Sequence, residues 1–125
     1  MKLDLPSSTG PLLRVEGQID GKAILLKFSG EADVEAKPEI DNVVRKIHEE
    51  ALKLEAERVE VDLRQLEFMN SSCFKVFVSW LGSVQDLDAS KQYRIHLLSN
   101  PNLHWQRRSL AALSCFAVDL VTITT

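Results

Sequence analysis

Near the start of the chain, apolar and polar positions alternate with a period of two, the pattern of half-buried β-strands. One such run extends from Leu13 to Ile19, and a second covers KAILLKF at residues 22–28. Asp20-Gly21 lies between them and accepts the positive φ values of a tight hairpin turn. The pattern therefore predicts two antiparallel strands joined by a short turn.

Later segments space their apolar residues as amphipathic helices do. The first covers residues 38–54 and begins at Pro38, which suits an initial helical turn. The second runs from Ser71 to about residue 87 and has a broad apolar stripe. A third helix is predicted to open at Asn100-Pro101, because Asn caps well and Pro is tolerated in the first turn.

A predicted strand follows each of these helices, at residues 58–68, 93–99 and 117–125. The first two alternate with a period of two, and the last is rich in β-branched residues. Strands that alternate with helices favour right-handed crossovers between parallel neighbours. We therefore predict a single α/β domain over residues 11–125, with a mixed, mostly parallel sheet, an N-terminal β-hairpin and about three packed helices. Residues 1–10 are rich in Pro, Ser, Thr and Gly and are interpreted as a flexible leader.

Composition narrows the class of protein. The 125 residues carry a formal net charge of -3, so nothing points to general nucleic-acid binding. No apolar run approaches the ~20 residues that cross a bilayer, and the N-terminus lacks the apolar core of a signal peptide. We therefore expect a cytoplasmic protein without membrane insertion.

The sequence contains few residues that suggest catalysis. It has no phosphate-binding glycine loop or nucleophile-elbow motif, and its three histidines show no metal-ligand spacing. Asp62 is interpreted as a strand-end residue that binds backbone amides, and Cys73 as a packed residue in a first helical turn. If the protein were an enzyme, these two residues would be its most plausible catalytic groups. We expect no enzymatic activity, no cofactor and no metal.

Ser71 and Ser72 lie where the strand at residues 58–68 gives way to the second helix. A serine at a helix start binds free backbone N–H groups and contributes about 1 kcal/mol as a cap. The same N–H groups and the positive end of the helix dipole accommodate an added phosphate. Local sequence is thus consistent with both a capping role and a phosphorylation site.

Three segments together resemble the STAS domains of bacterial anti-sigma factor antagonists. FSGEAD at residues 28–33 resembles the L-x-G-E-L-D segment of that family. VEVDLRQLEFMNSSCFKVF resembles the family's strand, D-S-S-G-L-G turn and helix, and residues 97–123 are similar to its last strand–helix–strand unit. The resemblance extends from about Leu12 to Ile123 and implies the SpoIIAA-like fold.

The resemblance implies that Ser71 is a regulatory phospho-acceptor, with Ser72 as second choice. The family aspartate is replaced by Asn70, and the family Gly-Leu-Gly is replaced by Cys73, Phe74 and Lys75. NSSCFK is similar to the N-T-S-S-x-K segment of a STAS-like branch typified by SiaC, in which an asparagine precedes the phosphorylated residue. Asn70 and Ser72 are then expected to shape the loop and cap the helix, with Cys73 and Lys75 beside the site.

The same resemblance implies a partner-switching protein. Its expected partners are a serine kinase of the anti-sigma type and a PP2C-type phosphatase, and the chain itself is expected to be a monomer or weak homodimer. The expected partner surface combines the start of the second helix with two loops, at Gly30, Glu31, Asp33, Phe74, Asn100 and Asn102. The alternative is a non-phosphorylated STAS scaffold that binds one partner permanently, as in a lipid-transport ATPase complex.

Overall fold

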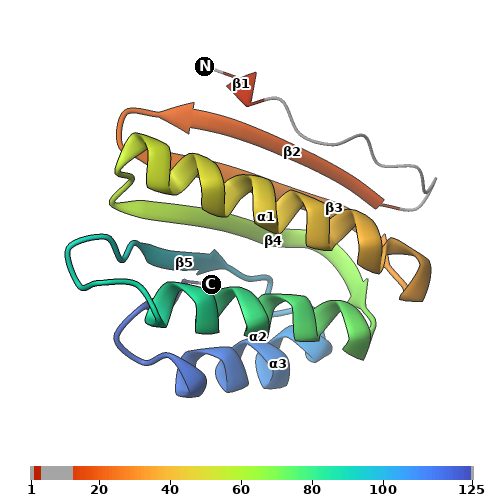
Figure 1. Cartoon of the computed structure of the whole chain (residues 1–125). Helices are drawn as coiled ribbons and strands as arrows, with labels where there is room; N and C mark the ends of the chain where they lie inside the picture. Colours follow the sequence, from red (N-terminus) through yellow and green to blue (C-terminus); the bar gives the residue numbers. More distant parts are fainter. Residues whose placement is uncertain (1, 4–12, 125) are drawn as a thin grey trace.

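The computed structural model describes residues 2–3 and 13–124, which form a six-stranded mixed sheet in the order β1-β2-β3-β4-β5-β6 (Figure 1). The predicted hairpin is present: β2 (Leu13–Asp20) pairs antiparallel with β3 (Ala23–Ala32). The turn between them places Gly21 at φ 60°, a left-handed conformation that glycine adopts without strain. The second strand is longer than predicted, because the segment 29–32 continues the pairing.

Two residues of the expected leader are part of the sheet. Lys2–Leu3 form β1, which pairs antiparallel with β2 through Lys2 opposite Gln18 and Leu3 opposite Gly17. The remainder of the expected leader, residues 1 and 4–10, lies outside the described residues.

The other strands extend the sheet in parallel from β3. They are β4 (Arg58–Met69), β5 (Arg94–Leu98) and β6 (Val121–Thr124). The last strand starts later than predicted, because residues 117–120 form turns in which the Leu120 and Val121 N–H groups donate to the Ala117 carbonyl.

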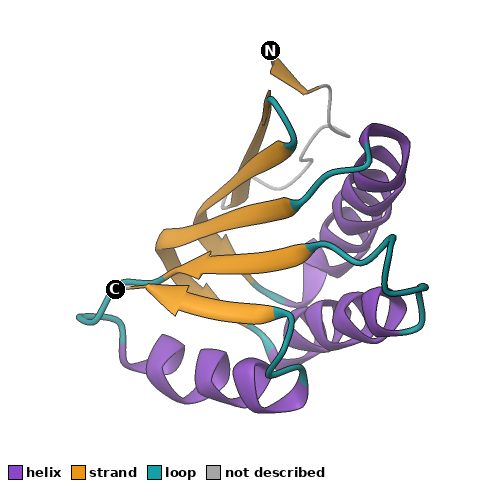
Figure 2. Ribbon diagram, turned by 90° about the vertical axis from the view of Figure 1, so that its left-hand side faces the viewer, coloured by secondary structure: helices purple, strands orange, loops and turns teal. Residues whose placement is uncertain are grey.

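The connecting helices α1 (Lys37–Leu54), α2 (Ser71–Gln85) and α3 (His104–Phe116) lie together on one face of the sheet (Figures 1 and 2). The described residues place no helix on the opposite face (Figure 2). Sheet residues therefore alternate: Ile24, Leu26 and Phe28 are fully buried under the helices, and Leu25 and Lys27 are only partly buried. Each fully buried large apolar side chain stabilises the fold by about 1.5–3 kcal/mol.

The start of the third helix was predicted wrongly. The helix begins at His104, and the Asn100 side chain instead accepts a hydrogen bond from the Asn102 N–H at 2.9 Å in a turn outside the helix. The Asn100 N–H donates to the Gln106 side-chain oxygen at 2.8 Å, and the Asn100 side-chain amide donates to the Arg64 carbonyl at 3.1 Å. These contacts with α3 and β4 hold residues 100–103 out of the helix.

Candidate functional site

The C-terminal ends of β3 and β4 meet the start of α2. Ala32 is paired with Met69, and one residue later the Asn70 N–H donates to the Ala32 carbonyl at 2.7 Å. A short 3-10 turn, η1 (Val34–Ala36), follows β3 and contacts α2. The FSGEAD segment and the NSS segment, 37 or more residues apart in sequence, are therefore adjacent at this edge of the sheet.

Asn70 caps α2. Its backbone is extended, at φ −67° and ψ 150°, and its side-chain oxygen accepts a hydrogen bond from the Ser72 N–H at 2.8 Å. This geometry confirms the cap expected of Asn70 and shows that neither serine performs it. The Ser71 hydroxyl is therefore not needed as a cap, and Ser71 is solvent-exposed as the first residue of the helix, whereas Ser72 is half-buried.

Cys73 fastens the start of α2 to the turn after β3. The residue is fully buried, and its thiol donates to the Asp33 carbonyl at 3.2 Å. Burial raises the pKa of the Cys73 thiol, the charge of Asp33 raises it further, and Lys37 partly offsets both. A thiol held protonated and away from solvent is a poor nucleophile, which agrees with its interpretation as a packed residue.

Gly30, Glu31 and Asp33 lie along the end of β3 and the turn that follows it. Gly30 has φ 94° and is paired with Leu66 of β4, and exposed Glu31 is opposite Phe68. The Asp33 carboxylate accepts a hydrogen bond from the Glu35 N–H at 3.0 Å and caps η1. Of these three residues, Glu31 is the one that is exposed.

Two large apolar side chains are exposed at this edge: Val34, which ends the loop expected at the partner surface, and Phe68, which sequence reasoning missed. Val34 is 61% exposed and Phe68 is 45% exposed. The alternation of buried and exposed residues in β4 breaks at two shifts in its pairing with β3. The first shift, between Lys27 and Ser29, leaves Arg64 and Gln65 both exposed, and the second, between Gly30 and Glu31, leaves Phe68 exposed opposite Glu31. On α2, Phe74 is partly buried against the core and Lys75 is exposed, one turn after Ser71.

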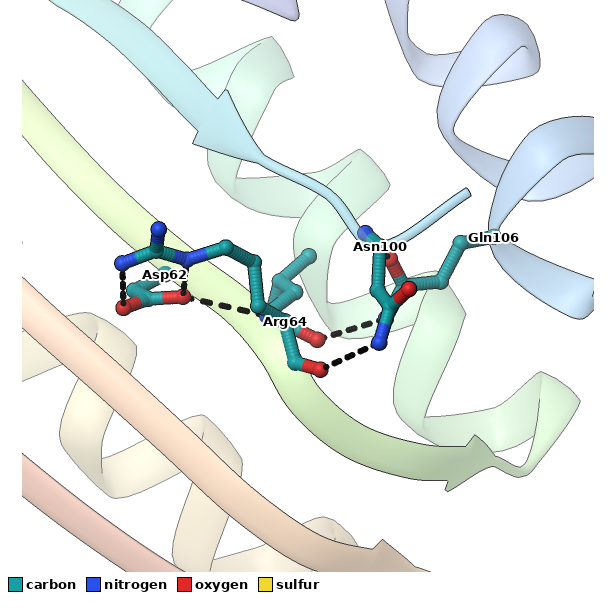
Figure 3. A network of polar contacts seen from close by, with 5 residues as sticks. Asp62, Arg64, Asn100 and Gln106 are labelled. Atoms are coloured by element: carbon teal, nitrogen blue, oxygen red, sulfur yellow. Dashed lines mark hydrogen bonds and ion pairs between the residues drawn. The ribbon is translucent and has the colours of Figure 1, made fainter. Parts of the chain in front are cut away.

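The shift in β4 is supported by side chains from α3 and the loop before it (Figure 3). Pairing between β4 and β5 ends at Asp62 opposite Leu98. Beyond it, the Gln106 amide nitrogen donates to the Leu63 and Leu66 carbonyls at 2.5 and 3.2 Å. Gln106 is only 1% exposed, and it replaces the backbone partners that β5 does not provide.

Asn100 and Asn102 were expected at the partner surface. The side-chain amide of Asn100 donates to the Arg64 carbonyl of β4, which lies upstream of the Met69–Ser71 segment. Asn102 is exposed in the turn that Asn100 closes. The loop therefore contacts β4 in the region that leads to the site, and Asn100 has a structural role there.

Asp62 lies inside β4 and not at a strand end, because the strand continues to Met69. Its carboxylate receives two hydrogen bonds from the Arg64 guanidinium, at 3.0 and 2.9 Å, and one from the Arg64 N–H at 3.0 Å. The side-chain hydrogen bond from Arg64 lowers the pKa of Asp62 against the smaller effect of burial. The Asp62 carboxylate is ionised and already paired with Arg64, so it is better suited to a structural ion pair than to the role of a general base.

A second polar cluster joins α1, α2 and the segment before β5. The Trp80 indole N–H donates to the Tyr93 hydroxyl at 2.7 Å, and that hydroxyl lies 2.6 Å from His48 Nδ1. The hydroxyl has one proton and two acceptor sites, so it donates to His48 Nδ1 or accepts from it according to the tautomer of the imidazole. Burial lowers the pKa of His48 and raises the pKa of Tyr93. His48 thus links α1 to the buried Trp80–Tyr93 pair.

The described residues contain no cluster of histidine, cysteine and acidic side chains arranged to hold a metal ion. In the same part of the chain, no helix is long and apolar enough to cross a membrane.

Comparisons with known proteins identify the fold. No family model matches the sequence, and no curated protein matches it significantly. Solved structures do: an anti-sigma factor antagonist from Mycobacterium paratuberculosis has a TM-score of 0.63 at 14% identity, with 86% of each chain covered. The anti-sigma factor antagonist SpoIIAA in its unphosphorylated form has a TM-score of 0.59 at 19% identity, covering 90% of this chain and 88% of that one.

A third similar structure is the protein TM1081, with a TM-score of 0.60 at 20% identity, covering 86% of this chain and 78% of the other. The predicted fold class is thereby confirmed: the chain has the STAS fold of SpoIIAA-like proteins.

Proposed function

We propose that this protein is a phosphorylation-controlled partner switch without a catalytic step of its own, and that Ser71 is its phospho-acceptor. The observation that carries the proposal is the exposed Ser71 at the first position of α2, directly after a cap supplied by another residue. Two of the similar structures are anti-sigma factor antagonists, and one of these is described as unphosphorylated.

The geometry suits a phosphate that alters the surface and leaves the fold intact. The first N–H groups of a helix have no intrahelical partner, and the helix dipole favours negative charge there. The N–H of Ser72 is bound by Asn70, so a phosphate on Ser71 would rely on the remaining groups and on exposed Lys75 one turn away. Asn70 is neutral, and so adds no repulsion to the roughly two negative charges of the phosphate.

The partner surface would consist of the start of α2 and the turn after β3. It would combine Glu31, Asp33 and Phe74 with the two exposed apolar side chains, Val34 and Phe68. Gly30 would shape this surface from within the sheet, and Asn102 would extend it at its flank. We expect its partners to be a serine kinase of the anti-sigma type and a PP2C-type phosphatase, in the cytoplasm.

The test compares partner binding by charge and neutral variants of the same residue. Ser71→Asp should weaken binding to the kinase partner, and Ser71→Ala should retain the affinity of the unmodified protein. Ser72→Asp is the matched control, because it places the same charge one residue along on a half-buried side chain. Equal affinity of the Ser71→Asp and Ser71→Ala proteins would refute the switch.

A permanent STAS scaffold is the second candidate function. The hydrogen bond from Cys73 to Asp33 favours it, because a bulky buried thiol replaces the glycine of the family and fastens the helix start to the preceding turn. A chain that always co-purifies with one ATPase and never carries phosphate would support this alternative. Loss of that association on phosphorylation would exclude it.

A further inference from the structure

The outer side of α3 presents several apolar side chains to solvent. α3 is the last helix of the layer and lies at the β6 end of the sheet (Figures 1 and 2). Gln106, Leu110 and Leu113 face inward. The exposed apolar residues from the middle of the helix into the turn that follows it are Ala111, Ala112, Cys115, Phe116 and Val118.

Two of these exposed side chains are large and apolar. Phe116 is 47% exposed and Val118 is 73% exposed, and residues 111–118 contain no charged side chain. Single exposed apolar residues are ordinary on a soluble protein, but a contiguous patch marks an interaction surface. At its centre, Ala111 and Ala112 are short enough to let another helix approach closely.

Charges are distributed unequally at the two ends of the patch. Arg107 and Arg108 are exposed at the N-terminal end, and Asp119 is exposed just beyond the C-terminal end. Among the described residues none of these three forms an ion pair. A surface that is basic at one end and acidic at the other complements itself when two copies meet in antiparallel orientation.

We infer that α3 is a self-association surface, on which a second copy of this chain packs its own α3 antiparallel about a two-fold axis near Ala111 and Ala112. This arrangement places Arg108 of each copy at the Phe116–Asp119 end of the other. Antiparallel packing also brings the positive end of each helix dipole beside the negative end of the other, which is favourable. The inference concerns a surface separate from the start of α2, and it does not depend on the proposed switch.

Sedimentation velocity of the full chain at loading concentrations from about 10 to 500 μM tests the inference, a range that detects weak dimers. The unmodified chain should show a concentration-dependent dimer that weakens in high salt, because exposed charges are screened. Ala112→Glu should raise the dissociation constant by at least about tenfold, since it places two like charges at the two-fold axis. Asn42→Glu is the matched control, with the same added charge on the exposed side of α1.

Charge reversal tests the antiparallel arrangement itself. Arg108→Asp and Asp119→Arg should each weaken the dimer, and the double variant should restore it, with circular dichroism confirming that every variant is folded. A chain that stays monomeric over the whole range would overturn the inference. So would equal dimerisation of the Ala112→Glu and Asn42→Glu proteins, or a double charge variant no stronger than the single ones.

Discussion

Gln106 provides the sharpest test of how the site is held in place. Replacing it with methionine keeps the length and approximate volume of the side chain and removes its hydrogen bonds. The Leu63 carbonyl loses a 2.5 Å partner, and the Asn100 N–H loses a 2.8 Å partner. The Leu66 carbonyl keeps one partner, because the Trp105 indole also donates to it at 3.2 Å.

The expected magnitude follows from these contacts. Leaving a buried polar group unsatisfied costs about 1–3 kcal/mol. Leu63 and Gln106 are each 1% exposed, so water cannot replace the lost bond to the Leu63 carbonyl, while the Asn100 N–H is only partly buried. We expect Gln106→Met to lower the free energy of unfolding by about 3 kcal/mol in total, which corresponds to a fall in Tm of roughly 10 °C for a chain of this size.

The assay is urea unfolding followed by circular dichroism, with Gln85→Met as the matched control. Gln85 also donates from its side-chain amide to a carbonyl, that of Phe116 at 3.2 Å, but it is exposed on α2. Water can replace that bond, so the control should change stability by less than about 0.5 kcal/mol. Equal losses in the two variants, or a loss below about 1 kcal/mol for Gln106→Met, would refute the reasoning.

Three further predictions follow from the site and its surroundings. Asn70→Ala should destabilise the protein by about 1 kcal/mol through loss of the α2 cap, whereas Ser71→Ala should have almost no effect in the same urea titration. Under native conditions a thiol reagent should modify exposed Cys115 rapidly and buried Cys73 only on unfolding; two equally fast thiols would contradict the burial of Cys73. His48 has a lowered pKa, so the unfolded chain takes up its proton near pH 6.5 while the folded chain does so only at lower pH. The stability that neutral His48 contributes should therefore be complete above about pH 6.5 and lost as the pH falls through the lower pKa of the folded state. The His48→Gln variant should show less of this pH dependence.

The order and type of the main elements followed from apolar periodicity together with turn and helix-start residues. The hairpin was marked by Asp20-Gly21, and the helices by regular burial of one side, as at Ile40, Val43 and Ile47 of α1. The register shift in β4 was not predictable in this way, because the carbonyls beside it bind the side chain of Gln106, which is 40 or more residues away in sequence. Periodicity describes a strand's own residues and contains no information about such a distant partner.

The capping and loop assignments show the same limit. Asn70, Ser71 and Ser72 all suit a helix start by residue type, and only the backbone conformation of Asn70 decides which of them caps α2. Asn100 was a reasonable cap by the same rule, but its contacts with Arg64 and Gln106 delay α3 to His104. Local preference located both helix starts to within a few residues, and tertiary contacts decided their first residues.

The measurement that tests the central claim most directly is the intact mass of the protein isolated from the organism that makes it, followed by fragmentation to locate any added phosphate. The account predicts a population heavier by one phosphate group, with the modification on Ser71, and none in a strain that carries Ser71→Ala. A phosphate located on Ser72 or elsewhere, or a protein without phosphate under all growth conditions, would contradict it.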